Sequence, residues 1–262
     1  MNLDLTQRSA VVCGSSQGIG LAAAIELARL GASITLVARD SERLQLAISK
    51  LPRSLGQHHD FMAVDFQQPE QVSAVISEWV RRGHHADILV NNAGGPAPGP
   101  VRNASIAELR GAFDAHLIVN QILVEHLSPG MIERGYGRII NVISTSVKQP
   151  IPGLGVSNTI RGAVANWAKT LAGELAPYGV TVNNVLPGAT RTARLEAIIE
   201  TSAAKHGVSA DEAEQRMLES IPAKRFAEPH EVGAAIAFLA SPAAAYITGI
   251  NLPVDGGRTS CL

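Results

Sequence analysis

Short runs of β-branched residues alternate with longer helical patterns from the start of the chain. The first predicted strand, Ser9–Cys13, is followed directly by a helical pattern over 19–30. Further strands are predicted at 34–37, 61–64, 88–90, 138–143, 180–186 and 250–254, with helices at 41–50, 70–82, 106–133 (broken near its start), 162–175 and 228–239. Strands and helices that alternate at this spacing form βαβ units, so the sequence predicts one parallel sheet with helices on both faces.

Composition and charge narrow the class of protein. The 262 residues include 22 basic and 23 acidic side chains, so the net charge of -1 provides no basic surface for nucleic acid or an anionic membrane. The N-terminus lacks a secretory pattern, and the most apolar stretch, 233–240, is too short to span a bilayer. Cys13 and Cys261 do not suggest a disulfide framework. We therefore expect a soluble, cytoplasmic protein, with 1–262 as a single domain.

A glycine-rich turn, Cys13-Gly14-Ser15-Ser16-Gln17-Gly18-Ile19-Gly20, joins the first strand to the first helix. Glycines allow the backbone to approach a pyrophosphate closely, and the helix N-terminus offers free N–H groups and a positive dipole end. The alternative is a tight turn with a close helix–strand contact. Its position after the first strand favours nucleotide binding.

Arg39 follows the second strand, where the adenosine ribose lies in a fold of this kind. An acidic residue there accepts the 2′-hydroxyl of NAD, whereas an arginine can pair with the 2′-phosphate of NADP. Ala38 leaves no carboxylate at the strand end. The alternative is a solvated Arg39 beside Asp40, a plausible helix cap. The residues favour NADP over NAD.

With these motifs, nearly the whole chain resembles the short-chain dehydrogenase/reductase family. Asp65 is similar to the family's adenine-contacting aspartate, Asn91-Asn92-Ala93-Gly94 matches its signature, and Pro187–Thr192 resembles the turn that holds the nicotinamide carboxamide. The ending Val254-Asp255-Gly256-Gly257 also looks like the family's. The resemblance implies a Rossmann-type, doubly wound α/β fold with about seven strands, a homotetramer, and hydride transfer between a nicotinamide and a carbonyl or alcohol. The residues matched to cofactor binding are Gly14, Ser16, Gln17, Gly18, Ile19, Gly20, Arg39, Asp65, Asn91, Ala93, Gly94, Pro187, Gly188, Thr190 and Thr192.

The catalytic residues depart from the family, which normally uses Asn, Ser, Tyr and Lys. Counting from the flanking motifs places Ser144 at the serine position, but Ser157 at the tyrosine, Arg161 at the lysine and His116 at the asparagine position. Ser157 is a much weaker acid than tyrosine, and Arg161 is permanently protonated. Because Ser157 and Arg161 are four residues apart on a helix, they share a face, where the cation can hold ribose hydroxyls or an anionic substrate.

Two residues are candidates for the missing acid. His116 has an intrinsic pKa suited to proton exchange at pH 7, and its matched position behind Arg161 suggests a relay. Lys148 is expected to line the substrate side. The alternatives are a packed helix histidine and a solvated loop lysine. No metal is expected, because His58-His59 and His84-His85 are adjacent pairs whose side chains diverge.

Three functions remain open. The first is an NADP-dependent oxidoreductase that uses Ser144 to polarise a carbonyl, with the proton handled by His116, Lys148 or water held by Ser157. The second is an NADP-binding protein without redox turnover, and the third is a lyase or isomerase. We favour the oxidoreductase, with a small-molecule substrate. The charged helical segment 191–225 is expected to form a lid beside the carboxyl ends of the strands.

Overall fold

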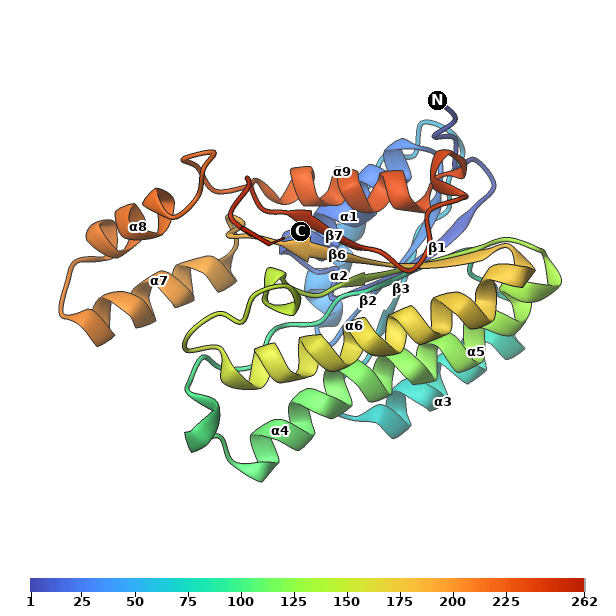
Figure 1. Ribbon diagram of the computed structural model, residues 1–262. Helices are drawn as coiled ribbons and strands as arrows, with labels where there is room; N and C mark the ends of the chain where they lie inside the picture. Colours follow the sequence, from blue (N-terminus) through green and yellow to red (C-terminus); the bar gives the residue numbers. More distant parts are fainter. Residues whose placement is uncertain (262) are drawn as a thin grey trace.

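A computed structural model describes residues 1–261 (Figure 1) and contains one seven-stranded parallel sheet. The strands are β1 (Ser9–Cys13), β2 (Ser33–Ala38), β3 (Asp60–Ala63), β4 (Ile88–Asn91), β5 (Gly137–Val142), β6 (Val180–Pro187) and β7 (Asn251–Val254). Their spatial order is β3-β2-β1-β4-β5-β6-β7. The chain therefore builds the sheet outward from β1 in one direction and from β4 in the other. The carboxyl ends of β1 and β4 mark the switch point at which ligands bind in such sheets.

Helices cover both faces of the sheet (Figure 1). One face carries α1 (Gly18–Arg29), α2 (Ser41–Ile48) and α9 (Pro229–Ala240), and the other carries α3 (Pro69–Arg81), α5 (Val119–Glu133) and α6 (Gly155–Leu175). Strand β1 shows why two cores form. Ala10 and Val12 pack into the first core, whereas Val11 and Cys13 pack into the second, because successive side chains of a strand point to opposite faces.

The structure confirms the predicted parallel sheet with helices on both faces and the predicted interruption of the helix over 106–133, and it corrects the start of one helix. The predicted helix over 106–133 is divided into α4 (Ile106–Phe113), a π-helical turn Asp114–Ile118, and α5. The predicted helix over 162–175 begins at Gly155, seven residues earlier. Gly155 packs so closely on Val101 that a β-carbon would not fit, so a tertiary contact overrides the weak helix propensity of glycine.

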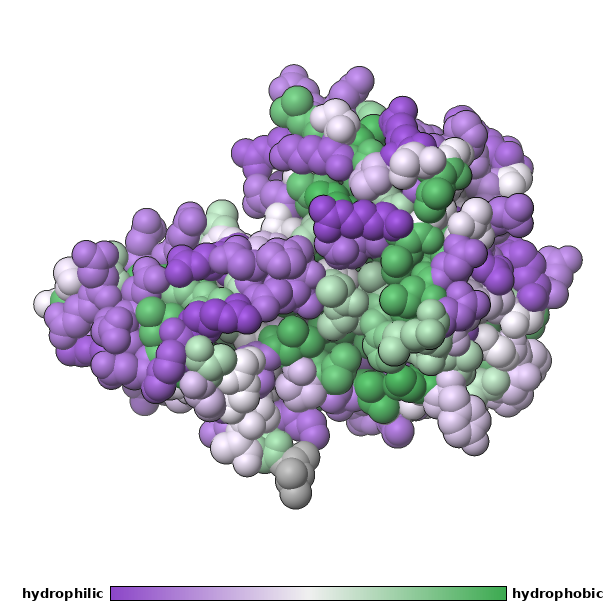
Figure 2. Space-filling view, turned by 90° about the horizontal axis from the view of Figure 1, so that it is seen from above, coloured by the Kyte–Doolittle hydropathy of each residue, from purple (hydrophilic) through white to green (hydrophobic). Residues whose placement is uncertain are grey.

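Helices α7 (Ala193–His206) and α8 (Ala210–Glu219) project from the end of the sheet (Figure 1). They pack on each other through a small core that includes Leu195, Ile199 and Phe226. In the view from above, hydrophilic side chains cover most of this projection (Figure 2). No helix within residues 1–261 is long and apolar enough to cross a membrane.

Candidate active site

A cleft of about 1450 Å³ lies at the carboxyl ends of the strands, beside α7. It contacts both the turn after β1 and the segment after β4, which flank the switch point of the sheet. The cleft brings together most of the residues that the sequence nominated. Those that line it are Gly14, Ser16, Gln17, Gly18, Ile19, Arg39, Asp65, Ala93, Gly94, Ser144, Ser157, Arg161, Pro187, Gly188, Thr190 and Thr192.

The glycine turn is shaped by close contact with Asn92. Gly14 and Gly18 have φ angles of 56° and 60°, a region that favours glycine. A β-carbon on Gly14 would lie 2.5 Å from the carbonyl oxygen of Asn92. The Asn92 amide in turn donates to the carbonyl oxygens of Cys13 at 3.3 Å and Gly14 at 3.2 Å. Gly20 is buried and does not line the cleft; it lets α1 approach Gly14 closely.

The N-terminus of α1 is suited to a phosphate. Its N-cap residue, Gln17, makes no side-chain capping bond, and no acidic residue lies in the first turn. The first N–H groups of this helix therefore lack a side-chain acceptor and face a cleft lined by Gly14 and Gly18. The crowding at Gly14 and the uncapped helix together fit the pyrophosphate of a dinucleotide.

Arg39 and Asp65 line the end of the cleft that was expected to hold the adenosine. Arg39 is exposed and lines the cleft directly after β2. Its neighbour Asp40 is engaged elsewhere, because its carboxylate caps α2 by accepting from the Arg43 N–H at 3.0 Å. The carboxylate of Asp40 is thus occupied, while the Arg39 guanidinium remains at the cleft wall, an arrangement that fits a 2′-phosphate.

Threonines follow Pro187 at the opposite end of the cleft. The Thr190 hydroxyl donates to the Gly188 carbonyl at 3.2 Å, and the Thr192 hydroxyl donates to the Thr190 carbonyl at 3.2 Å. Thr192 is also the N-cap of α7. A β-carbon on Gly18 would lie 3.4 Å from the Thr192 methyl carbon, so this segment closes over the glycine turn.

Ser144 follows β5 and is the N-cap of a short 3-10 turn. Its Oγ accepts a hydrogen bond from the Ser146 N–H at 3.1 Å, and the side chain lines the cleft. No acceptor for the Ser144 hydroxyl proton is present within residues 1–261, so this O–H can donate to a ligand. Ser157, on α6, lines the same cleft and is only 9% exposed.

Arg161 is held by two backbone carbonyls. Its Nη1 donates to Val142 at 2.9 Å and its Nη2 donates to Ala93 at 3.4 Å. Burial, with a smaller contribution from Arg194, lowers the pKa of Arg161 to about 10. The side chain therefore stays charged at neutral pH, and it joins the end of β5 to the segment that follows β4.

His116 lies in the π-helical turn and does not line the cleft. The sequence predicted proton exchange near pH 7, but the side chain is only 3% exposed. Burial, and then the charge of Arg161, lowers the pKa of His116 to about 2, although a hydrogen bond with the Gly94 backbone acts in the opposite direction. At neutral pH the imidazole is uncharged, which corrects the expectation of an acid that titrates near pH 7.

Two other nominated residues lie outside the cleft. Lys148 is half-buried in the loop after Ser144 and, contrary to the expectation, does not line the cleft. The short 3-10 turn at 145–147 separates it from Ser144. Asn91 is 2% exposed, and its amide donates to Asn141 at 2.8 Å within the sheet. The neighbouring Asn92 lies directly after the end of β4 and lines the cleft instead.

The buried asparagines form a chain across four strands. Asn141 donates to Asn184 at 2.9 Å, and Asn184 donates to Asn251 at 2.8 Å. Together with Asn91, these residues occupy paired register positions on β4, β5, β6 and β7. The chain of amides therefore ties together the strands whose ends carry the cleft.

Sequence reasoning missed two residues that shape the cleft. Asn92 was recognised only as part of a motif, although its place directly after a predicted strand could have indicated the carboxyl edge of the sheet, where ligands bind. Arg194, the second residue of α7, reaches across to donate to the Pro96 carbonyl at 2.6 Å. These residues are 98 positions apart, and the sequence contains no signal for this contact.

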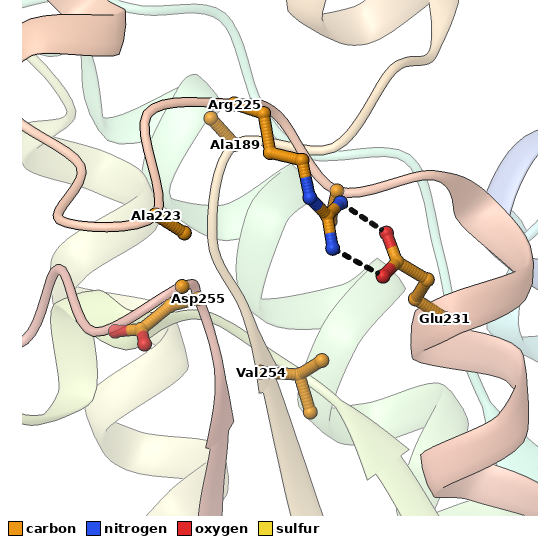
Figure 3. Close-up of a pocket in the computed structure, with 8 residues that line it drawn as sticks. Ala189, Ala223, Arg225, Glu231, Val254 and Asp255 are labelled. Carbon is orange, nitrogen blue, oxygen red and sulfur yellow. Dashed lines mark hydrogen bonds and ion pairs between the residues drawn. The ribbon is translucent and has the colours of Figure 1, made fainter.

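Metal binding and a smaller pocket are the two other features of residues 1–261 that bear on the site. No cluster of three or more His, Cys, Asp or Glu side chains that could hold a metal occurs in the described part of the chain. A small pocket of about 80 Å³ lies near the end of β7 (Figure 3). It is bordered by the paired Arg225 and Glu231, joined by two 2.7 Å hydrogen bonds.

Known proteins share both the sequence and the fold. A family model described as enoyl-(acyl carrier protein) reductase matches residues 14–259. The chain is also 34% identical over 255 residues to 3-oxoacyl-(acyl-carrier-protein) reductase FabG of Vibrio cholerae, covering 97% of this chain and 98% of that protein. The chain belongs to the short-chain dehydrogenase/reductase family. The family recognition and the predicted Rossmann-type fold are therefore confirmed.

Two further relatives of the family bear on the cofactor. The NADPH-dependent reductase BacG of Bacillus subtilis is 29% identical over 257 residues, covering 97% of this chain and 98% of that protein. The structure of L-sorbose reductase from Gluconobacter frateurii, complexed with NADPH and L-sorbose, superimposes with a TM-score of 0.92 at 34% identity and full coverage of both chains. The predicted oxidoreductase class is confirmed, and the predicted NADP agrees with these relatives.

Proposed function

We propose that this family member is an NADPH-dependent reductase of a small-molecule carbonyl compound, or the reverse dehydrogenase, with an altered set of catalytic residues. One observation carries the proposal: the Ser144 hydroxyl lies in the same cleft as the uncapped α1 N-terminus and Arg39. The cofactor supplies the hydride when bound. Arg39 and the α1 N-terminus would bind its phosphates, and Thr190 and Thr192 would orient its nicotinamide end.

Ser144 would polarise the substrate carbonyl. Its Oγ already accepts from the Ser146 N–H, which fixes the oxygen and leaves the proton to donate toward the cleft. Such a donor stabilises negative charge that develops on the oxygen. Ser157 would hold a water that delivers the proton. The positive charge of Arg161 nearby would favour ionisation of this water. His116, which is uncharged at neutral pH, would position Gly94 and Arg161 rather than exchange protons with the substrate.

The remaining features follow the same proposal. Residues 1–262 would act as a single cofactor-binding domain, with segment 191–225 as a lid over the substrate. We also propose a cytoplasmic location and, on the family resemblance, a homotetramer.

Stopped-flow absorbance at 340 nm tests the function. NADPH-loaded protein is mixed with a panel of ketones, aldehydes, diones and quinones. We expect oxidation by the wild type, and a loss of about 10²–10³-fold in rate for Ser144→Ala with unchanged NADPH affinity. The matched control is Ser146→Ala, in which the Ser144 hydroxyl is retained. Tight NADPH binding without oxidation across the panel would contradict the proposal.

A further inference from the structure

The cleft has an unusual distribution of charge for a chain whose net charge is -1. Six cationic side chains line the described part of the cleft, against a single carboxylate, that of Asp65. The cations are Arg39, Arg161, Arg191, Arg194, Lys205 and Arg258. Such a concentration of one sign in a partly enclosed site attracts anions.

The phosphates of NADPH account for only part of this charge. They would lie at Arg39 and at the N-terminus of α1, while the dihydronicotinamide ring itself is uncharged. The positive charge of Arg191 is balanced by ion pairs with Glu228 at 3.4 Å and Glu214 at 3.8 Å, neither of which lines the cleft. Arg161, Arg194, Lys205 and Arg258 have no carboxylate partner within residues 1–261, and of these Arg161 and Arg194 contact the segment that follows β4.

Arg161 is not available as a substrate anchor. It is buried, and its two terminal nitrogens are already bonded to the carbonyls of Val142 and Ala93. Arg194 is different, because it is half-buried and only its Nη2 is engaged, by Pro96. Within residues 1–261 its Nε and Nη1 groups make no hydrogen bond. Burial lowers the pKa of Arg194, which reflects the cost of leaving this cation partly desolvated without a counter-ion.

The position of Arg194 is also well defined. Its side chain spans from α7 to the Gly95–Pro96 segment, and a β-carbon on Gly95 would lie 3.3 Å from the Arg194 Nη2. The glycine thus makes room for the guanidinium. A guanidinium held on one side by a carbonyl presents its remaining N–H groups in a plane that matches a carboxylate.

We propose that the substrate carries a carboxylate and that Arg194 binds it, so that the reacting carbonyl is directed toward Ser144. The proposal rests on the proposed function for the identity of the reacting group, but the binding of the carboxylate can be measured without turnover. At this position a single guanidinium with unengaged N–H groups fits a singly charged carboxylate better than a phosphate dianion, because the neighbouring cation, Arg161, is already bonded to two carbonyls.

Calorimetric titration of NADP⁺-loaded protein provides the test. The ligands are straight-chain 2-, 3- and 4-oxo carboxylates and their methyl esters, which have the same chain without the charge. We expect at least one acid to bind about 10–100-fold more tightly than its ester. Arg194→Met should abolish this preference, Arg194→Lys should retain part of it, and both should bind NADP⁺ as the wild type does.

Arg216→Met is the matched control. Arg216 lies on the same projection, is paired with Glu212 at 2.6 Å, and does not line the cleft, so the preference for acids should persist. Equal binding of acids and esters, no binding of any acid, or a preference that survives Arg194→Met would overturn the inference.

NADPH oxidation in the same series separates the two proposals. If esters are reduced and acids are not preferred, the reductase function is supported and the carboxylate-binding role of Arg194 is contradicted. Acids bound through Arg194 without any NADPH oxidation would support the carboxylate site and contradict the reductase.

Discussion

The Nη1 group of Arg161 donates a hydrogen bond to the carbonyl oxygen of Val142 over 2.9 Å. A second bond, to Ala93, fixes the other terminal nitrogen. An arginine held in this way is a fixed cation and cannot exchange its proton at neutral pH. The site therefore differs in chemistry from one with tyrosine and lysine, although the two positions remain on one face of α6.

Restoring tyrosine and lysine should increase turnover. In the Ser157→Tyr/Arg161→Lys variant, the adjacent ammonium lowers the tyrosine pKa and provides a direct acid. We expect NADPH oxidation to rise by at least about tenfold, since positioned acid–base groups contribute 10²–10⁴-fold. Stopped-flow absorbance measures it, with Ser157→Tyr alone as the control. A double variant that is slower than the wild type would show that the native residues are the better catalysts.

Arg39 should discriminate between the two nicotinamide cofactors. Arg39→Ala removes the partner of the 2′-phosphate, so we expect the NADPH dissociation constant to rise about 10–100-fold and that of NADH to change little. Fluorescence titration measures both. Arg43→Ala is the control, because Arg43 is exposed nearby and does not line the cleft. Equal losses for NADPH and NADH would argue against a phosphate contact.

Gly14→Ala should lose both stability and cofactor binding. The positive φ and the clash with the Asn92 carbonyl act together, so we expect a loss of at least about 2 kcal/mol in unfolding free energy and weaker NADPH binding. Urea unfolding and titration measure these losses. Gly83→Ala separates the causes, because Gly83 has a φ of 86° but open space around it. It should lose only about 1–2 kcal/mol and bind NADPH normally.

His116 should make the fold sensitive to acid. Its pKa is about 2 in the folded state, below the ordinary value of 6.5, so the unfolded chain binds more protons between these pH values. The contribution of the uncharged imidazole to the unfolding free energy is fully present above pH 6.5. It falls as the pH decreases toward 2, by up to about 1.4 kcal/mol per pH unit.

Denaturant unfolding at pH 7.5, 6 and 5 measures this dependence. His116→Asn should reduce the slope below pH 6.5, whereas His58→Asn, at an exposed position, should keep the wild-type slope. Identical slopes for His116→Asn and the wild type would indicate that the imidazole is not desolvated.

The asparagine chain should be most sensitive at its centre. Asn141 is fully buried and bonded to both Asn91 and Asn184, so Asn141→Ala removes the acceptor of the Asn91 amide N–H and the donor to the Asn184 carbonyl oxygen. The loss of these two buried hydrogen bonds is expected to reduce the unfolding free energy by about 2–4 kcal/mol. Asn251→Ala, at the half-buried end, breaks one bond and should lose less than half as much. Similar losses at both positions would show that the amides do not act as a chain.

The sequence alone determined the sheet and the part of the cleft formed by the glycine turn and Arg39. Each strand and helix carries its own periodic pattern, and the glycine turn and Arg39 follow directly from the strands that position them. Local patterns of this kind are readable because their geometry depends on neighbouring residues. The substitutions at Ser157 and Arg161 were likewise visible from their spacing to other motifs.

Only the tertiary structure decided the chemistry of the part of the cleft near His116, Arg161 and Arg194. Burial makes His116 an uncharged group, although its residue type suggests a titrating one. The contact of Arg194 with Pro96 joins two segments 98 residues apart. Desolvation and long-range contacts depend on which elements pack together, and no periodicity within one segment encodes them. The early start of α6 at Gly155 belongs to the same class, since packing overrode local propensity there.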